Sequence, residues 1–128
     1  MELEQLREQY RQDLLEDCIP FFDKFVVDRV YGGFLCNADR DGTRLSDRKE
    51  TWFEGRGIWV YSFLHRNFGG NPQHMDVARK SMKFIIEARP EGVDALWPDR
   101  LTREGQPLSP PSASIYGDLF IAEGLVEF

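Results

Sequence analysis

One stretch, residues 49–64, combines an arginine with aromatic side chains at spacings that could form a binding site. On a helix, which turns by about 100° per residue, a sector of about 60° contains Trp52, Arg56, Trp59 and Phe63, with Lys49 at its edge. A guanidinium group keeps its charge and needs oxygen acceptors when it lies among apolar rings. A carbonyl or polyhydroxyl ligand offers such oxygens, and indole rings pack well on sugar faces and on guanidinium planes. The pattern therefore fits either a sugar-like ligand site or a structural arginine paired with an acid from another helix.

The rest of this helix predicts how it packs. A second apolar sector consists of Phe53, Val60 and Leu64, and the side facing away from both sectors consists of Glu54, Ile58, Ser62 and His65. Gly55 and Gly57 flank Arg56, although each costs a helix about 1 kcal/mol relative to alanine. We expect them to allow close approach of a backbone or a ligand.

Length and composition indicate one domain with an apolar core, because the chain has 128 residues of which 41% are hydrophobic. The net charge of −6 argues against nucleic acid or an anionic membrane as a partner. No apolar run is long enough to span a membrane, and the charged first residues do not resemble a signal peptide, so we expect a cytoplasmic protein. Cys18 and Cys36 are isolated, and we expect both to be buried thiols.

The periodicity of apolar residues predicts four helical segments separated by two irregular ones. The first runs from Leu3 past Pro20 to Val26, either as one kinked helix or as two. A glycine-rich stretch follows and predicts a short β-hairpin whose turn lies at residues 39–42. The central helix covers residues 49–68, and a third, which begins near Pro72, ends before Pro90.

A second hairpin and a fourth helix repeat this plan. The second hairpin is predicted to turn at residues 103–105, and the fourth helix to begin near Ser112 or Ser114. One face of this helix contains Tyr116, Phe120 and Glu123, and an adjacent aliphatic face contains Ile115, Leu119, Ala122 and Val126. The two turn glycines, Gly42 and Gly105, are about 60 residues apart, which is typical of an array of helical hairpins. Since the last helix is still periodic at Phe128, we expect the natural protein to continue.

The first turn also resembles the beginning of a calcium-binding loop. Loop positions one, three, five and six are occupied by Asn37, Asp39, Asp41 and Gly42. The position of the required bidentate glutamate is occupied by Arg48, so we expect a plain turn in which Asp39 and Asp41 accept from nearby backbone amides. We predict no metal site and no cofactor.

Three motifs, YGGFLCNADRDG, KETWFEGRGIWVYSFL and SIYGDLFIAEGLVEF, resemble the N-acylglucosamine 2-epimerase family in their order and spacing. This family also includes cellobiose 2-epimerases and aldose–ketose isomerases of unphosphorylated sugars. The resemblance covers nearly the whole chain but only about the first third of a family member. It implies an all-α fold, an (α/α)6 barrel or toroid with short β-hairpin loops, of which residues 1–128 are the amino-terminal part of a single domain.

The resemblance also implies a site and a reaction. The arginine that matches Arg56 lies in the sugar pocket of the family near the carbonyl end of the opened sugar, and aromatic residues that match Trp52 and Tyr116 line the same pocket. Further substrate-binding candidates are Trp59, Phe120 and Lys49. The reaction removes and returns a proton at C2, for which histidines supply the base and acid and a cation stabilises the oxyanion.

The catalytic histidines of the family lie on helices that would follow Phe128, so we expect no catalytic residue in this chain. His65 lies opposite Arg56 on its helix, and His74 lies in the first turn of an outer helix, so we expect both to be structural. The expected partner is a small sugar, and a homo-oligomer is possible.

Two other functions fit the sequence. A glycoside hydrolase or lyase on a similar toroid would need two carboxylates across the sugar, but Glu54 is expected to face away and Glu123 has no evident partner. A non-catalytic sugar-binding or interaction fragment would use the Arg56 face without proton transfer. The sequence does not distinguish N-acetylated sugars, free hexoses and cellobiose.

Overall fold

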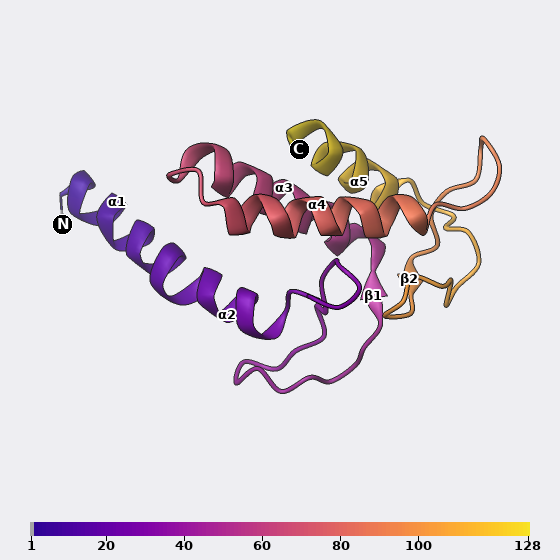
Figure 1. The fold of residues 1–128 in the computed structure, drawn as a ribbon, viewed down its shortest axis with the longest axis horizontal. Helices are drawn as coiled ribbons and strands as arrows, with labels where there is room; N and C mark the ends of the chain where they lie inside the picture. Colours follow the sequence, from indigo (N-terminus) through magenta and orange to yellow (C-terminus); the bar gives the residue numbers. More distant parts are fainter. Residues whose placement is uncertain (1) are drawn as a thin grey trace.

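Helices dominate the computed structural model, which describes residues 2–128 (Figure 1). The helices are α1 (Leu3–Gln12), α2 (Ile19–Phe25), α3 (Thr51–Asn67), α4 (Pro72–Glu87) and α5 (Tyr116–Glu127), and the strands are β1 (Lys49–Glu50) and β2 (Arg100–Leu101). None of the described helices is both long and apolar enough to span a lipid bilayer.

The first helical segment is continuous, because a π-helical stretch, Asp13–Cys18, joins α1 to α2. At its end the Ile19 N–H donates to the carbonyl of Leu14, five residues earlier, just before Pro20 removes a donor. Of the two predicted alternatives, one helix across the proline or two in sequence, the structure therefore shows the first. The expected burial of Cys18 is wrong, because its side of the helix faces solvent, whereas Cys36 is half-buried.

Both predicted turns form at their glycines. The Gly42 N–H donates to Asp39 at 2.9 Å, and the Gly105 N–H donates to Thr102 at 3.1 Å. The left-handed φ values of 88° at Gly42 and 97° at Gly105 explain the residue type. Asp39 and Asp41 accept from the amides of Arg40 and Thr43, as expected of a plain turn.

The arms of the two turns are joined only by isolated bridges, Ala38 with Arg44 and Leu101 with Pro107, and not by full hairpin strands. The two irregular segments instead pair with each other through β1 and β2, with Lys49 opposite Leu101. This antiparallel pair, which the sequence did not reveal, connects the entry to α3 with the second loop.

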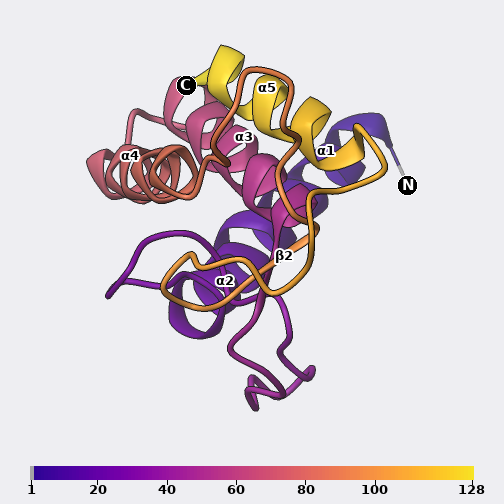
Figure 2. The same cartoon turned by 90° about the vertical axis from the view of Figure 1, so that its right-hand side faces the viewer.

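Helix α3 is the centre of the packing. It lies against both α4 and α5, as the end-on view in Figure 2 shows. The residues on it that are almost fully buried include Glu54, Ile58, Tyr61, Ser62 and Leu64. The expectation that the Glu54–Ile58–Ser62 side faces away from the core is wrong, since Ile58 shares a core cluster with Ile85 of α4 and Ile121 of α5. The aromatic side of α3 remains open.

Glycines set the distance between α3 and α5. A Cβ added to Gly55 would overlap the backbone of Phe120 and Ile121, and one added to Gly124 would overlap the carbonyl of Gly55. The expected close approach at Gly55 is therefore confirmed, and Gly57 gives similar room to the ring of Phe34.

Helix α5 begins at Tyr116, whose N–H donates to the Ser114 side chain at 3.3 Å. It contacts α3 through Ile121 and Gly124, while Leu119 and Val126 on its aliphatic face are exposed. Within the described chain, α5 thus packs through the side that contains Ile121 and Gly124 and not through its predicted aliphatic face.

Candidate functional site

Arg56 lies on the open side of α3 between two aromatic rings. Its guanidinium carbon is 5.9 Å from the ring centre of Trp52 and 5.6 Å from that of Phe120. Such placement over ring faces favours a cation. Among residues 2–128 no acid pairs with Arg56. Its donors can reach a ligand.

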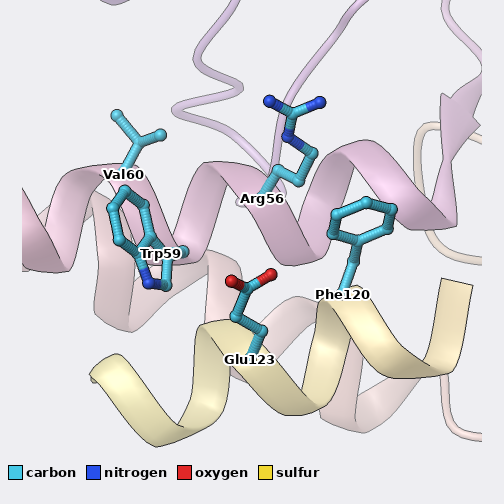
Figure 3. A pocket seen from close by; sticks show the side chains of 5 residues that line it. All are labelled: Arg56, Trp59, Val60, Phe120 and Glu123. Carbon is cyan, nitrogen blue, oxygen red and sulfur yellow. The ribbon is translucent and has the colours of Figure 1, made fainter.

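A cavity of about 410 Å³ opens beside Arg56 between α3 and α5 (Figure 3). Its lining consists of Arg56, Trp59 and Val60 from α3 and Phe120 and Glu123 from α5. Figure 3 shows the Glu123 side chain rising from α5 into the space between the two helices. This volume is in the range of small-molecule sites, and the mixture of rings with a few polar groups is typical of them.

A second cavity, of about 240 Å³, lies on the other side of Arg56, toward α2. It is lined by Phe22, Phe34, Trp52, Phe53, Arg56, Gly57, Val60 and Tyr61. Arg56 and Val60 border both cavities, so Arg56 lies between the first, more polar cavity and the second, more apolar one.

The predicted site residues occupy different positions relative to these cavities. Trp59 and Phe120 border the first, and Trp52, which is 41% exposed, borders the second. Tyr116 is one turn before Phe120, is 70% exposed, and lines neither cavity.

Lys49 is not available to a ligand, which corrects its proposed role. Its side chain is completely buried, and its ammonium group lies 3.0 Å from the carboxylate of Asp28. It also donates to the carbonyls of Gly32 at 2.6 Å and Arg103 at 2.8 Å. Lys49 thus ties the two loops to the start of α3, a role that its place at the edge of the aromatic sector did not reveal.

Asp28 is the centre of this buried charge cluster. Arg103 donates to it through two nitrogens, at 3.0 and 3.1 Å, in a bidentate arrangement. Burial alone would raise the pKa of Asp28, but the hydrogen bonds from Arg103 and Lys49 outweigh it and lower the pKa to about 2. Burial lowers the pKa of Lys49, against the opposing effect of the Glu54 and Asp28 carboxylates.

Glu54, the one acid of α3, also lies in the interior, and the sequence did not identify its role. Both of its oxygens are 3.1 Å from the N–H of Phe34, which donates to them. Burial raises the pKa of Glu54 to about 8, although the charge of Lys49 and the Phe34 hydrogen bond oppose the rise. Glu54 therefore holds the loop that places Phe34 against Gly57 beneath the second cavity.

Neither histidine lines either cavity. His65 Nδ1 is 2.9 Å from the carbonyl of Asn71, next to the start of α4. His74 is buried with its ring against the edge of Tyr61, and burial lowers its pKa. Among residues 2–128, no three histidine, cysteine or acidic side chains are grouped closely enough to hold a metal ion.

Comparison with known sequences identifies the family of the chain. The profile described as N-acylglucosamine 2-epimerase matches residues 32–125. The chain belongs to the N-acylglucosamine 2-epimerase family. The human N-acylglucosamine 2-epimerase is 27% identical over 130 residues, which cover 98% of this chain and 30% of the human protein. The mouse N-acylglucosamine 2-epimerase is 28% identical over 118 residues, 88% of this chain and 27% of the mouse protein.

Solved structures of sugar epimerases share the fold of this chain. The cellobiose 2-epimerase of Spirochaeta thermophila superposes with a TM-score of 0.81 at 22% identity, over 98% of this chain and 30% of that one. The cellobiose 2-epimerase of Bacillus thermoamylovorans gives 0.80 at 19% identity, over 98% and 32% of the two chains. The predicted all-α class, that of the α/α toroid, is confirmed. This chain spans about 30% of the length of these relatives.

Proposed function

We propose that the protein is a sugar 2-epimerase or isomerase that acts on an unphosphorylated sugar such as N-acetylglucosamine or N-acetylmannosamine. The observation that carries this proposal is the placement of Arg56, which has no acidic partner among residues 2–128, between the rings of Trp52 and Phe120 at the edge of a cavity. Membership of the N-acylglucosamine 2-epimerase family supports the same reaction class.

In the proposed reaction the open-chain sugar loses its C2 proton, and negative charge develops on the neighbouring carbonyl oxygen. Arg56 donates to that oxygen and stabilises the enolate, while the indole of Trp59 packs on a face of the sugar. Because the cation is fixed by aromatic rings before the substrate arrives, little reorganisation is needed during the reaction. Return of the proton to the opposite face of C2 completes the epimerisation.

The base and acid of this reaction are proposed to come from outside the described residues, because neither His65 nor His74 lines a cavity here. We accordingly propose that residues 1–128 are the amino-terminal part of a single (α/α)6 barrel in the cytoplasm. The mass of the intact protein from its natural source tests this arrangement. A mass well above that of the 128-residue chain is expected, and an equal mass in a folded, active sample would contradict it.

A non-catalytic sugar-binding role is the second candidate, and the absence of an imidazole from both cavities favours it. A glycoside hydrolase has less support. Glu123 is the one carboxylate that lines either cavity, and Glu54 is buried in the core, whereas hydrolysis requires two carboxylates facing the sugar.

Hydrogen exchange at C2 separates catalysis from binding. The intact protein is incubated with N-acetylmannosamine in D2O, and the H2 signal is followed by proton NMR. Epimerisation predicts loss of that signal at a rate proportional to protein concentration. Binding without exchange would favour the non-catalytic role.

Arg56→Lys tests the role of the guanidinium group. Lysine keeps the charge but loses the planar fork of donors, so we expect a decrease in exchange rate of about 100-fold, in the range found for loss of one oxyanion donor. Arg79→Lys, at an exposed position on α4 away from both cavities, is the matched control and should exchange like the wild type. An Arg56→Lys variant with the wild-type rate would contradict the proposed role of Arg56.

A further inference from the structure

Glu123 places a negative charge in the same cavity as Arg56. Among residues 2–128 it takes part in no ion pair, whereas Glu127, one turn later on α5, pairs with Arg66 at 3.2 Å. No hydrogen bond of its carboxylate is found in that part of the chain either. A carboxylate that borders a cavity without a protein partner is free to accept hydrogen bonds from a ligand.

The surroundings of this carboxylate are aromatic. Figure 3 shows Glu123 between Trp59 and Phe120, both of which line the cavity. Rings on either side limit the directions from which donors can approach it. A ligand that packs flat on the indole would present its edge hydroxyls to the carboxylate.

The backbone positions of Glu123 and Arg56 are set by the close contact between α3 and α5. Arg56 follows Gly55, and Glu123 precedes Gly124, and these two glycines form the close contact between α3 and α5. Arg56 and Glu123 are therefore the sequence neighbours of the glycines at this close contact. Among residues 2–128, nevertheless, they form no salt bridge within 4.0 Å. A cation and an anion that line the same cavity without pairing suit a ligand with both acceptors and donors.

We propose that Glu123 is a specificity-determining residue that binds hydroxyl groups of a neutral sugar and excludes anionic sugars. This inference rests on the proposed function, because it assigns the substrate class of the same site. An ionised carboxylate only accepts hydrogen bonds, and its two oxygens can receive adjacent hydroxyls. Phosphate and carboxylate groups offer no such donors and are repelled. Arg56 alone would attract anions, so Glu123 supplies the selection against them.

The test compares binding of a neutral sugar with binding of its anionic counterpart. Affinities of the intact protein for N-acetylmannosamine and for N-acetylmannosamine 6-phosphate are measured by calorimetry, with wild type and Glu123→Gln. Glutamine keeps the shape and one acceptor but removes the charge, so the Kd for the neutral sugar should rise on the order of fivefold. The Kd for the phosphate should fall several-fold, with a dependence on salt.

Glu91→Gln is the control, because it removes the same charge at an exposed position that borders neither cavity. It should leave both affinities unchanged. In the exchange assay, Glu123→Gln should raise KM with little change in kcat, since the carboxylate holds the ground state and the transition state alike.

The outcomes distinguish this inference from the proposed function. If the wild type binds and exchanges the neutral sugar while Glu123→Gln leaves the ratio of the two affinities unchanged, the role of Glu123 is overturned and the function stands. If the wild type binds the neutral sugar without exchange but the variant shifts the ratio, catalysis is overturned and the role of Glu123 stands. A wild type that binds no neutral sugar overturns both.

Discussion

Replacement of Gly55 by alanine tests whether the cavity depends on the close contact between α3 and α5. The new methyl group would overlap the backbone of Phe120 and Ile121, and neither backbone can rotate away as a side chain could. Helix α5 must therefore move outward from α3. Since Phe120 and Glu123 are carried by α5 and Arg56 by α3, the same movement widens the cavity.

The expected loss of stability follows from two opposing effects. Alanine is a better helix former than glycine by about 1 kcal/mol, which favours the variant. Overpacking of a core contact typically costs ~1–3 kcal/mol, and an overlap with backbone belongs at the upper end of this range. The net expectation is a decrease of about 2 kcal/mol in the free energy of unfolding.

Urea unfolding of the intact protein, followed by circular dichroism, measures this change, and calorimetry measures affinity for N-acetylmannosamine. The control is Gly117→Ala in the first turn of α5, where the added methyl group would be 3.1 Å from the Thr51 side chain and 3.8 Å from the backbone nitrogen of Trp52, an ordinary contact distance. We expect this control to be nearly neutral, because a side chain can shift and the helix gains propensity. A Gly55→Ala variant as stable as the control would refute the argument that backbone contact fixes the helix spacing.

Three further variants test the buried polar groups. Asp28→Asn should destabilise the fold by about 3 kcal/mol or more, because Lys49 would remain buried without its counter-charge. In the wild type the folded pKa of Asp28 is lowered to about 2, so the stability that its ionised carboxylate contributes should be lost as the pH falls below about 4. Urea unfolding midpoints measured across this acid range would show the loss. The pKa of Glu54 is raised to about 8, so between about pH 4.5 and 8 the folded state keeps a proton that the unfolded state has released. The free energy of unfolding should therefore decline as the pH rises through this range. Glu54→Gln should flatten that decline in the same measurement. Tyr61→Phe should cost about 1 kcal/mol in thermal unfolding, because the Tyr61 hydroxyl donates to Asp23 at 2.7 Å, and an unchanged Tm would show that this hydrogen bond adds nothing.

The order of the elements could be predicted from the sequence because it depends on local chemistry. Periodicity predicted the helices, and the turn residues that end in Gly42 and Gly105 predicted the two turns, where the structure shows left-handed φ values. The motif resemblance predicted the family and the fold, and the family profile that matches residues 32–125 confirms the family.

Which side of α3 faces the core could not be predicted, because that depends on where α4 and α5 lie. The wheel separates residues into sectors, but both the aromatic sector and the Glu54–Ile58 sector contain polar and apolar members. Only the tertiary contacts of Ile58 with Ile85 and Ile121 identify the buried one. The pairing of β1 with β2 was missed for the same reason, since its partners are about 50 residues apart.

The two cations at the start of α3 show what local spacing leaves undetermined. On the helical wheel, Lys49 lies at the edge of the aromatic sector and Arg56 lies within it. In the structure, Lys49 is fully buried and Arg56 is exposed. Their fates differ because a buried carboxylate, Asp28, comes from the loop before β1 and satisfies Lys49. No acid of the described chain reaches Arg56. The partner therefore separates the two charges: Lys49, whose acid is supplied by the fold, joins the scaffold, whereas Arg56 is the cation that we propose binds a ligand.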